Sequence, residues 1–300
     1  MRVDPGYVSN LTGALDEAQR REQQLANQLA TGLRISSLSD DPIAAGQNVL
    51  LLNQIERDDS FTQTSSLVTG QLQVADSALG GVVTQLNQAI SLATSANNGT
   101  KNASDLKAIA NQLAGILGEV ESLSNSNYQG QYIFAGGQTN SAPFNTDDSS
   151  TPAQTIYSGD GHVNYIETPS GQKIQLNVPG NQIFLGGTAS VFGALNSLIA
   201  NLSGDTVDQA QAAHDAEALT SALKYVSQQR VLLDNSITQL TTASGAATAE
   251  KTQLSASQTE LMQADLADVA TQLSLAKTQE SALESVIVQL GSGSLFDKLR

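Results

Sequence analysis

Apolar residues recur at seven-residue intervals near both ends of this 300-residue chain, with a second apolar series offset by three or four positions. This spacing gives a helix one narrow apolar stripe, which is typical of a coiled-coil or bundle seam. Glu22, Arg230 and Glu280 interrupt the stripes. The seam residues that we predict to pack between subunits are Leu11, Leu15, Leu25, Leu29, Leu266, Leu273, Leu283, Ile287 and Leu290. The same residues would equally form the core of a self-contained bundle, because a heptad pattern does not specify which chain supplies the partner helix.

Two further helices are predicted between these ends, one from about residue 42 to the turn signal at 97–99 and one over about 104–123. The start of the first is marked by Asp41, whose carboxylate can accept hydrogen bonds from unpaired amides, and by Pro42, which suits the first helical position. The stretch Leu33–Asp41 is therefore predicted to be a hinge between two helices.

The middle of the chain has a different composition. Eight of the twelve Phe and Tyr residues and four of the six prolines lie between positions 128 and 192. Short alternating segments at 155–157, 162–166 and 173–178 predict strands, and Gly159-Asp160-Gly161 has the composition of a hairpin turn. These features predict a small β-rich domain at about 136–194.

The predicted fold is mainly α with an inserted β-rich domain: a long helical rod or coiled coil built from both termini, with a central β lobe. The predicted domains are 1–42 with 258–300 (terminal coiled coil), 43–135 with 195–257 (helical rod) and 136–194 (β-rich outer domain). Terminal helices with so little apolar surface are marginal alone, so we expect them to need each other or neighbouring subunits.

Charge and composition exclude several classes of protein. With 14 basic and 29 acidic side chains the formal charge is −15, which argues against a nucleic-acid partner. The chain has no cysteine, so a disulfide framework or a thiolate metal site is impossible. The longest apolar run is four residues, too short for insertion in a membrane. The first 30 residues show no Sec-type signal, so we expect either a cytoplasmic protein or export by a route that reads no such signal.

No pattern in the chain indicates catalysis. The two histidines, His162 and His214, lie in different predicted regions, and no spacing suggests a metal site. There is no Gly-x-Ser-x-Gly elbow, and the loop at 159–161 lacks the Gly-Lys-Ser/Thr ending of a phosphate-binding loop. We therefore predict no catalytic residue, no cofactor, no metal and no enzymatic activity.

Three groups of residues resemble the bacterial flagellin family. Leu29-Ala30-Thr31-Gly32-Leu33-Arg34-Ile35 with Ser39-Asp40-Asp41-Pro42 resembles its N-terminal signature, and Ala264-Asp265-Leu266-Ala267 with Ser294-Leu295-Phe296-Asp297-Lys298-Leu299 resembles its closing segment. The motif Tyr128-Gln129-Gly130-Gln131-Tyr132-Ile133-Phe134-Ala135-Gly136, followed by Pro143-Phe144 and by Tyr157-Ser158-Gly159-Asp160-Gly161, is more similar to the hook-associated branch of the family. Leu33 departs from that branch, in which a basic residue is common, and is typical of flagellin.

The resemblance implies export through the flagellar type III apparatus and an extracellular location in the bacterial flagellum. It implies terminal helices packed in an axial assembly and a structural role at the hook–filament junction. The implied partners are other copies of the chain in a ring, the first hook-associated protein (FlgK), flagellin and an export chaperone. One alternative is a short flagellin that forms the filament itself. Another, from a different class, is a secreted binding module that uses the central β domain.

Overall fold

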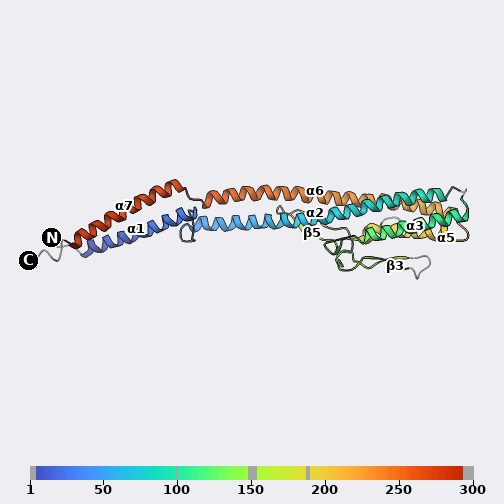
Figure 1. The fold of residues 1–300 in the computed structure, drawn as a ribbon, viewed down its shortest axis with the longest axis horizontal. Helices are drawn as coiled ribbons and strands as arrows, with labels where there is room; N and C mark the ends of the chain where they lie inside the picture. The colour runs from blue at the N-terminus through green and yellow to red at the C-terminus, as the bar shows by residue number, and fades with distance from the viewer. Residues whose placement is uncertain (1–4, 99–100, 148–153, 187–189, 293–300) are drawn as a thin grey trace, which may run out of the picture. The chain divides into compact units, whose positions relative to one another are not determined.

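The computed structural model describes residues 5–98, 101–147, 154–186 and 190–292, with only the backbone described at 5–8 and 290–292 (Figure 1). The helices are α1 (Pro5–Thr31), α2 (Pro42–Ala96), α3 (Ala103–Ser124), α4 (Gly180–Phe184), α5 (Val191–Ser203), α6 (Gln209–Met262) and α7 (Leu266–Ser292). The strands are β1 (Asn127–Tyr128), β2 (Gln131–Tyr132), β3 (Phe144–Asp147), β4 (Gln154–Tyr157), β5 (Tyr165–Glu167) and β6 (Lys173–Gln175). The predicted fold class, long helices with a small strand-containing region between them, is confirmed. None of the described helices combines the length and the apolarity needed to cross a membrane.

The chain forms two compact units. Unit 1 contains residues 1–57 and 250–300, and unit 2 contains residues 58–249. Unit 1 therefore combines both ends of the chain, as the paired seams at the two termini predict. The region 136–194 lies within unit 2. The finer three-domain boundaries given above stay a prediction.

Unit 2 has one continuous apolar core formed by helices α2, α3, α5 and α6 together with the strand region. The seven-residue pattern of α2 explains its contribution, because Leu72, Leu79 and Leu86 are at most 1% exposed. On α6, Leu219 and Leu233 are buried at the corresponding spacing. The seam of α2 and α6 is thus filled by side chains of this chain itself throughout unit 2.

The charge of Arg230, which interrupts the apolar series of α6, is paired. Arg230 of α6 donates two hydrogen bonds to Asp76 of α2, from Nε to Oδ1 at 2.8 Å and from Nη2 to Oδ2 at 3.0 Å. These bonds raise the pKa of Arg230 above its usual value. The carboxylate of Asp76 therefore compensates the cation that interrupts the apolar series.

The strands form three separate antiparallel pairs, β1 with β2, β3 with β4, and β5 with β6. Around them four phenylalanines and one tyrosine pack with neighbouring ring centroids 5.0–5.8 Å apart. The rings belong to Phe134, Phe144, Tyr157, Phe184 and Phe192. This aromatic cluster joins β3, β4 and the segment after β2 to α4 and α5, so this part of the region is held by side-chain packing and not by one shared sheet.

The hairpin turn predicted at Gly159-Asp160-Gly161 is wrong. Strand β4 pairs with β3 before it, and β5 pairs with β6 after it, so the segment connects two hairpins. Its Asp160 carboxylate instead accepts hydrogen bonds from the amides of Gly137, at 2.6 Å, and His162, at 3.0 Å. Asp160 thus combines a local bond to His162 with a distant one to Gly137, the residue that follows the motif ending at Gly136.

Unit 1 consists of α1, α7 and the adjoining ends of α2 and α6. Helices α1 and α7 run antiparallel along each other (Figure 1). Their shared core is small: the buried members are Leu25, Ala264, Val269 and Ala276, with Leu273 packed against them. Little apolar area is removed from water by this pairing, in contrast to unit 2.

Candidate assembly interface

The chain crosses twice between the helix pair α1/α7 and the adjoining ends of α2 and α6, at residues 32–41 and 263–265. We call these two crossings the joint. They are hydrogen-bonded to each other: the amide of Arg34 donates to the carbonyl of Met262 at 2.7 Å, and the amide of Ala264 donates to the carbonyl of Gly32 at 2.9 Å. Leu33 and Gln263 form an antiparallel bridge between these bonds. Gly32 has a φ of +70°, a conformation that side chains disfavour, and it ends α1 in the usual manner of a C-terminal glycine.

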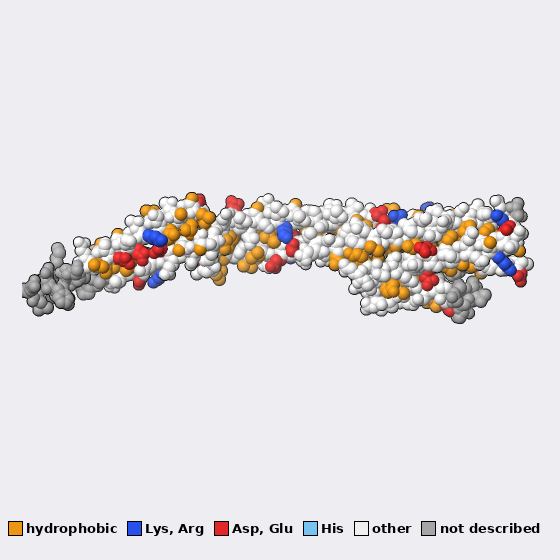
Figure 2. All heavy atoms as spheres, viewed as in Figure 1, with side chains coloured by type: hydrophobic (Ala, Val, Ile, Leu, Met, Phe, Trp, Pro, Cys, Tyr) orange, Lys and Arg blue, Asp and Glu red, His pale blue; other side chains and the backbone are white. Residues whose placement is uncertain are grey.

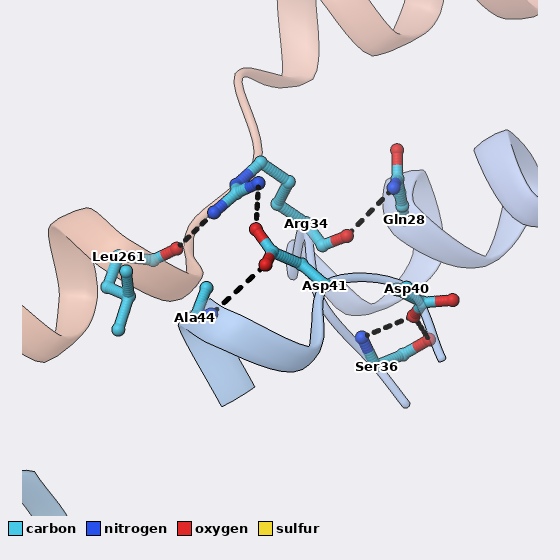
Figure 3. A network of polar contacts seen from close by, with 7 residues as sticks. All are labelled: Gln28, Arg34, Ser36, Asp40, Asp41, Ala44 and Leu261. Carbon is cyan, nitrogen blue, oxygen red and sulfur yellow. Dashed lines mark hydrogen bonds and ion pairs between the residues drawn. The ribbon is translucent and has the colours of Figure 1, made fainter. Parts of the chain in front are cut away.

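Arg34 binds both sides of the joint (Figure 3). Its Nη2 donates to the carbonyl of Leu261 at 3.1 Å, and its Nη1 lies 3.4 Å from Oδ2 of Asp41. Its own carbonyl accepts a hydrogen bond from Nε2 of Gln28 at 2.9 Å. The side chain of Arg34 therefore holds the end of α6 and the start of α2 together, and its backbone carbonyl binds the end of α1. Sequence reasoning missed this role, although Arg34 is the one basic residue in the predicted hinge.

The two acidic residues of the first crossing, Asp40 and Asp41, organise the backbone there. Oδ1 of Asp41 accepts a hydrogen bond from the amide of Ala44 at 3.0 Å, and α2 begins at Pro42. Oδ2 of Asp40 accepts from the amides of Ser36 and Ser37, both at 2.9 Å. The backbone hydrogen bond from Ser36 is the main cause that lowers the pKa of Asp40, and that from Ala44 lowers the pKa of Asp41. Asp40 is thus a structural part of the hinge.

The predicted seam residues differ in how far their own chain covers them. Leu25 is buried between α1 and α7, and Leu11, Leu15, Leu273, Leu283 and Ile287 are half-buried. Leu29 and Leu266 are 40% and 47% exposed. The side chain of Leu290 lies outside the described residues. Helices α1 and α7 therefore satisfy part of the seam within the chain and leave part of it open, and the assignment of these residues to contacts between subunits stays a prediction.

Large apolar side chains outside the predicted seam are also exposed on unit 1, where Figure 2 shows hydrophobic residues over α1, α7 and the neighbouring helix ends. Among the described residues, eleven large apolar side chains of unit 1 are at least 38% exposed, against six in the larger unit 2. Those of unit 1 are Leu29, Leu33, Leu38, Ile43, Val49, Leu50, Leu52, Leu266, Leu275, Val286 and Val288. Contiguous apolar exposure of this kind marks surfaces that bind other protein.

A groove of about 500 Å³ runs between α1 and α7. Its apolar lining comes from Ala14, Ala18, Ala282, Leu283 and Val286. Small alanines on both sides make the groove, because they leave space where larger seam residues would fill it. Of the described part of the chain, no three His, Cys, Asp or Glu residues are grouped so that they could hold a metal ion. The arrangement of unit 1 is thus suited to packing against other helices.

The motif at 128–136 has a structural role. The backbone at Gln129 and Gly130 is left-handed, with φ values of +52° and +82°, which forms the tight turn between β1 and β2. Gly136 is also left-handed, and a side chain there would overlap Asp160. The segments around residues 136 and 160 therefore meet in direct contact, with no room for a ligand between them.

Comparison with known proteins agrees with these observations. The family model described as the bacterial flagellin N-terminal helical region matches residues 7–139. Flagellar hook-associated protein 3 of Salmonella typhimurium is 34% identical over 139 residues, which are 46% of this chain. The match spans 44% of the length of that relative. The resemblance to the flagellin family and its hook-associated branch is confirmed by these matches.

Solved structures share the fold. Flagellar hook-associated protein 3 from Legionella pneumophila superposes with a TM-score of 0.63 at 14% identity, covering 71% of this chain and 98% of that one. The flagellar junction protein FlgL from the same organism gives a TM-score of 0.58 at 14% identity, with 72% and 99% covered. At such identities the similarity concerns the fold, and this chain has the fold of those two proteins.

Proposed function

Because residues 7–139 match the flagellin N-terminal region and the fold is that of hook-associated proteins, we propose that this chain is a structural subunit of the bacterial flagellum at the hook–filament junction. It joins the hook-associated ring to the flagellin filament through packing of its terminal helices. The role is non-enzymatic: binding is performed by apolar surface, and the polar groups of the joint are used in holding backbone.

The observation that carries the proposal is the apolar exposure of unit 1. Ile43, Leu50 and Val288 are 77%, 66% and 69% exposed, so the described part of the chain leaves most of each side chain uncovered. Burying one such side chain contributes about 1.5–3 kcal/mol, so several of them together supply a substantial part of a stable contact. A ring of identical copies, with different proteins above and below it, covers these surfaces on all sides.

The partners that follow are further copies of this chain, FlgK on the hook side and flagellin on the filament side, with an export chaperone before assembly. The location is extracellular, and export proceeds through the flagellar type III apparatus. Marginal terminal helices suit this route, because a chain that is threaded unfolded must form them again at its destination.

Incorporation into flagella tests the proposal. In cells lacking the native gene, variants Leu50→Ser and Val288→Ser should lose incorporation at the junction and swimming motility. Both residues are already exposed in the free chain, so its circular dichroism should be unchanged. Matched controls are Leu67→Ser and Val231→Ser, whose side chains in unit 2 are 51% and 58% exposed. Both controls should incorporate normally. Normal incorporation of the unit 1 variants, or of chains lacking residues 1–40 or 265–300, contradicts the proposal.

A short flagellin is the competing function, since the matching family model is that of the flagellin N-terminal region and Leu33 is typical of flagellin. Purified chain added to short filament seeds separates the two. We expect attachment at filament ends without elongation. Sustained growth of long filaments would show that the chain is a filament subunit.

A further inference from the structure

The charged residues that interrupt the seams are compensated differently in the two units. In unit 2, Arg230 meets the opposite charge of Asp76. In unit 1, both interruptions are acidic, and they meet each other: Glu22 of α1 faces Glu280 of α7, and their side chains share a hydrogen bond. The like charges therefore lie at the position where a seam would normally place two apolar side chains.

The antiparallel register of α1 and α7 fixes this juxtaposition. On one side of Glu22, Leu25 is buried together with Ala276 and Val269. On the other side, Ala18 and Leu283 line the groove between the helices. Glu22 lies three positions before Leu25, and Glu280 lies four positions after Ala276. Because the helices are antiparallel, these two positions face each other. Figure 2 shows acidic and basic side chains gathered along this pair of helices.

The charged groups around the pair come from both helices. On α1, Glu17 and Arg21 line the groove beside it, and Nη2 of Arg21 donates to Oε1 of Gln272 at 3.5 Å. From α7, Lys277 places Nζ 3.8 Å from Oε1 of Glu22, with 61% of the lysine side chain exposed and 26% of the glutamate side chain exposed. Glu284 lies one turn beyond Glu280 on the same helix. On α1, the residues three and four positions from Glu22 are uncharged; they are Ala18, Gln19, Leu25 and Ala26.

A hydrogen bond between two carboxyl groups requires a proton on one of them. The hydrogen bond with Glu280 is the main cause that raises the pKa of Glu22 above the ordinary glutamate value of 4.5. Partial burial and the repulsion between the two charges raise this pKa further, and Lys277 lowers it. An exposed lysine at this distance offsets little of the repulsion, because water screens it. When both carboxyl groups are ionised, the bond is lost and the helices repel at this point.

We propose that Glu22 and Glu280 make the pairing of α1 with α7 proton-dependent, so that the pair is held by a shared proton and loosens when both carboxylates are charged. The inference rests on the proposed function, since it describes how the unit that assembles is regulated. In a free subunit whose two carboxylates are both charged, loosened pairing leaves the seam side chains of α1 and α7 available to other copies. Within an assembly, neighbouring helices then supply the contacts that this pair lacks.

The direction of the effect follows from linkage. A carboxyl group whose pKa is raised in the paired state stabilises pairing fully below the pKa of the unpaired state, and this stabilisation is lost as pH rises through the higher value. Pairing therefore weakens as pH rises above about 4.5, by at most about tenfold per pH unit for one linked proton. Asp40 and Asp41 have lowered pKa values and stay charged in this range, so the joint does not contribute to the change.

Spin labels on the two helices measure the pairing directly. The natural chain has no cysteine, so Gln23→Cys and Thr278→Cys, both at exposed positions, give one label on each helix of the full-length chain. Double electron–electron resonance then reports the fraction of molecules with the labels at the short, paired distance. We expect this fraction to fall as pH rises from 4 to 8, beginning above the ordinary glutamate value of 4.5.

Three variants in the labelled chain decide the mechanism. Glu22→Gln should keep the fraction high and remove its pH dependence, because the amide donates the hydrogen bond without titrating. Glu17→Gln, at an exposed position on the same helix, should keep the original profile. Glu22→Leu with Glu280→Leu should raise the paired fraction at pH 8. A flat profile in the labelled chain, an unchanged profile in Glu22→Gln, or no gain in the double leucine variant would overturn the inference.

The same variants in flagella separate this inference from the proposed function. If the resonance profile is flat while Leu50→Ser still abolishes incorporation, the proton-linked pairing is wrong and the junction role stands. If the profile is as expected but Leu50→Ser incorporates normally, the pairing stands and the junction role is wrong.

Discussion

Replacing Arg230 by methionine tests how the charged seam position of unit 2 is stabilised. Methionine keeps most of the aliphatic stem and removes both hydrogen bonds to Asp76, which are 2.8 and 3.0 Å long. The side chains are 33% and 24% exposed, so the carboxylate that remains is only partly hydrated. Arg230→Met therefore lowers the free energy of unfolding in two ways: it removes a bidentate, charge-assisted contact, and it leaves the Asp76 carboxylate unpaired.

The expected magnitude lies between two limits. A fully exposed ion pair is worth about 0–1 kcal/mol, whereas removing one partner of a buried pair costs about 3–5 kcal/mol. For a pair that is one-third to one-quarter exposed, we expect Arg230→Met to lower the free energy of unfolding of unit 2 by about 1–2 kcal/mol. Adding Asp76→Leu should recover most of this loss, because the double variant leaves no uncompensated charge in the seam.

Urea unfolding followed by circular dichroism measures these changes, and hydrogen exchange of peptides from α2 and α6 assigns them to unit 2. The matched control is Lys107→Met, since Lys107 lies 3.6 Å from an Asp205 side chain that is fully exposed. This control should leave the urea midpoint unchanged. The reasoning is refuted if Arg230→Met unfolds at the wild-type midpoint, or if the double variant is less stable than the single one.

Two further predictions concern the turns and caps. Gly136→Ala should destabilise unit 2 by more than about 2 kcal/mol, because it adds an overlap with Asp160 to the strain of a φ of +68°. Gly130→Ala, at a φ of +82°, meets no atom within 4 Å and should cost only about 1 kcal/mol. Equal urea midpoints for the two variants would contradict this expectation. The lowered pKa values of Asp40 and Asp41 predict that stabilisation of the joint is complete above the ordinary aspartate value of 3.8 and is lost as pH falls through the lower folded values. In Asp41→Asn, which retains a capping oxygen, hydrogen exchange at the start of α2 should respond less to acid than in the natural chain, and an identical acid response would exclude Asp41 as its source.

The parts of this structure that follow from short-range sequence patterns were predictable. The seven-residue spacing identified the long helices, and Asp41-Pro42 identified the start of α2. Clustered aromatics and prolines identified the strand region, because these residues favour extended structure and turns locally.

The parts that depend on distant contacts were not predictable. Arg34 binds a carbonyl 227 positions away, and Glu22 meets Glu280 only after α1 and α7 have paired. Seam interruptions at these positions are visible in the sequence, but the sign of the facing charge is set by the register of two helices. The segment at 159–161 shows the same limit, since Asp160 accepts a hydrogen bond from the local amide of His162 and also one from the amide of Gly137, 23 positions away, which the sequence does not reveal.

The double crossing at the joint has a mechanical consequence. Because the linkers at 32–41 and 263–265 are bonded to each other through Gly32, Arg34, Met262 and Ala264, neither can swing without stretching bonds to the other. A bend or twist applied to α1 and α7 must therefore pass to the adjoining ends of α2 and α6 through both linkers at once. Torque that enters through one terminus of the chain is shared with the other terminus before it reaches the rest of the subunit.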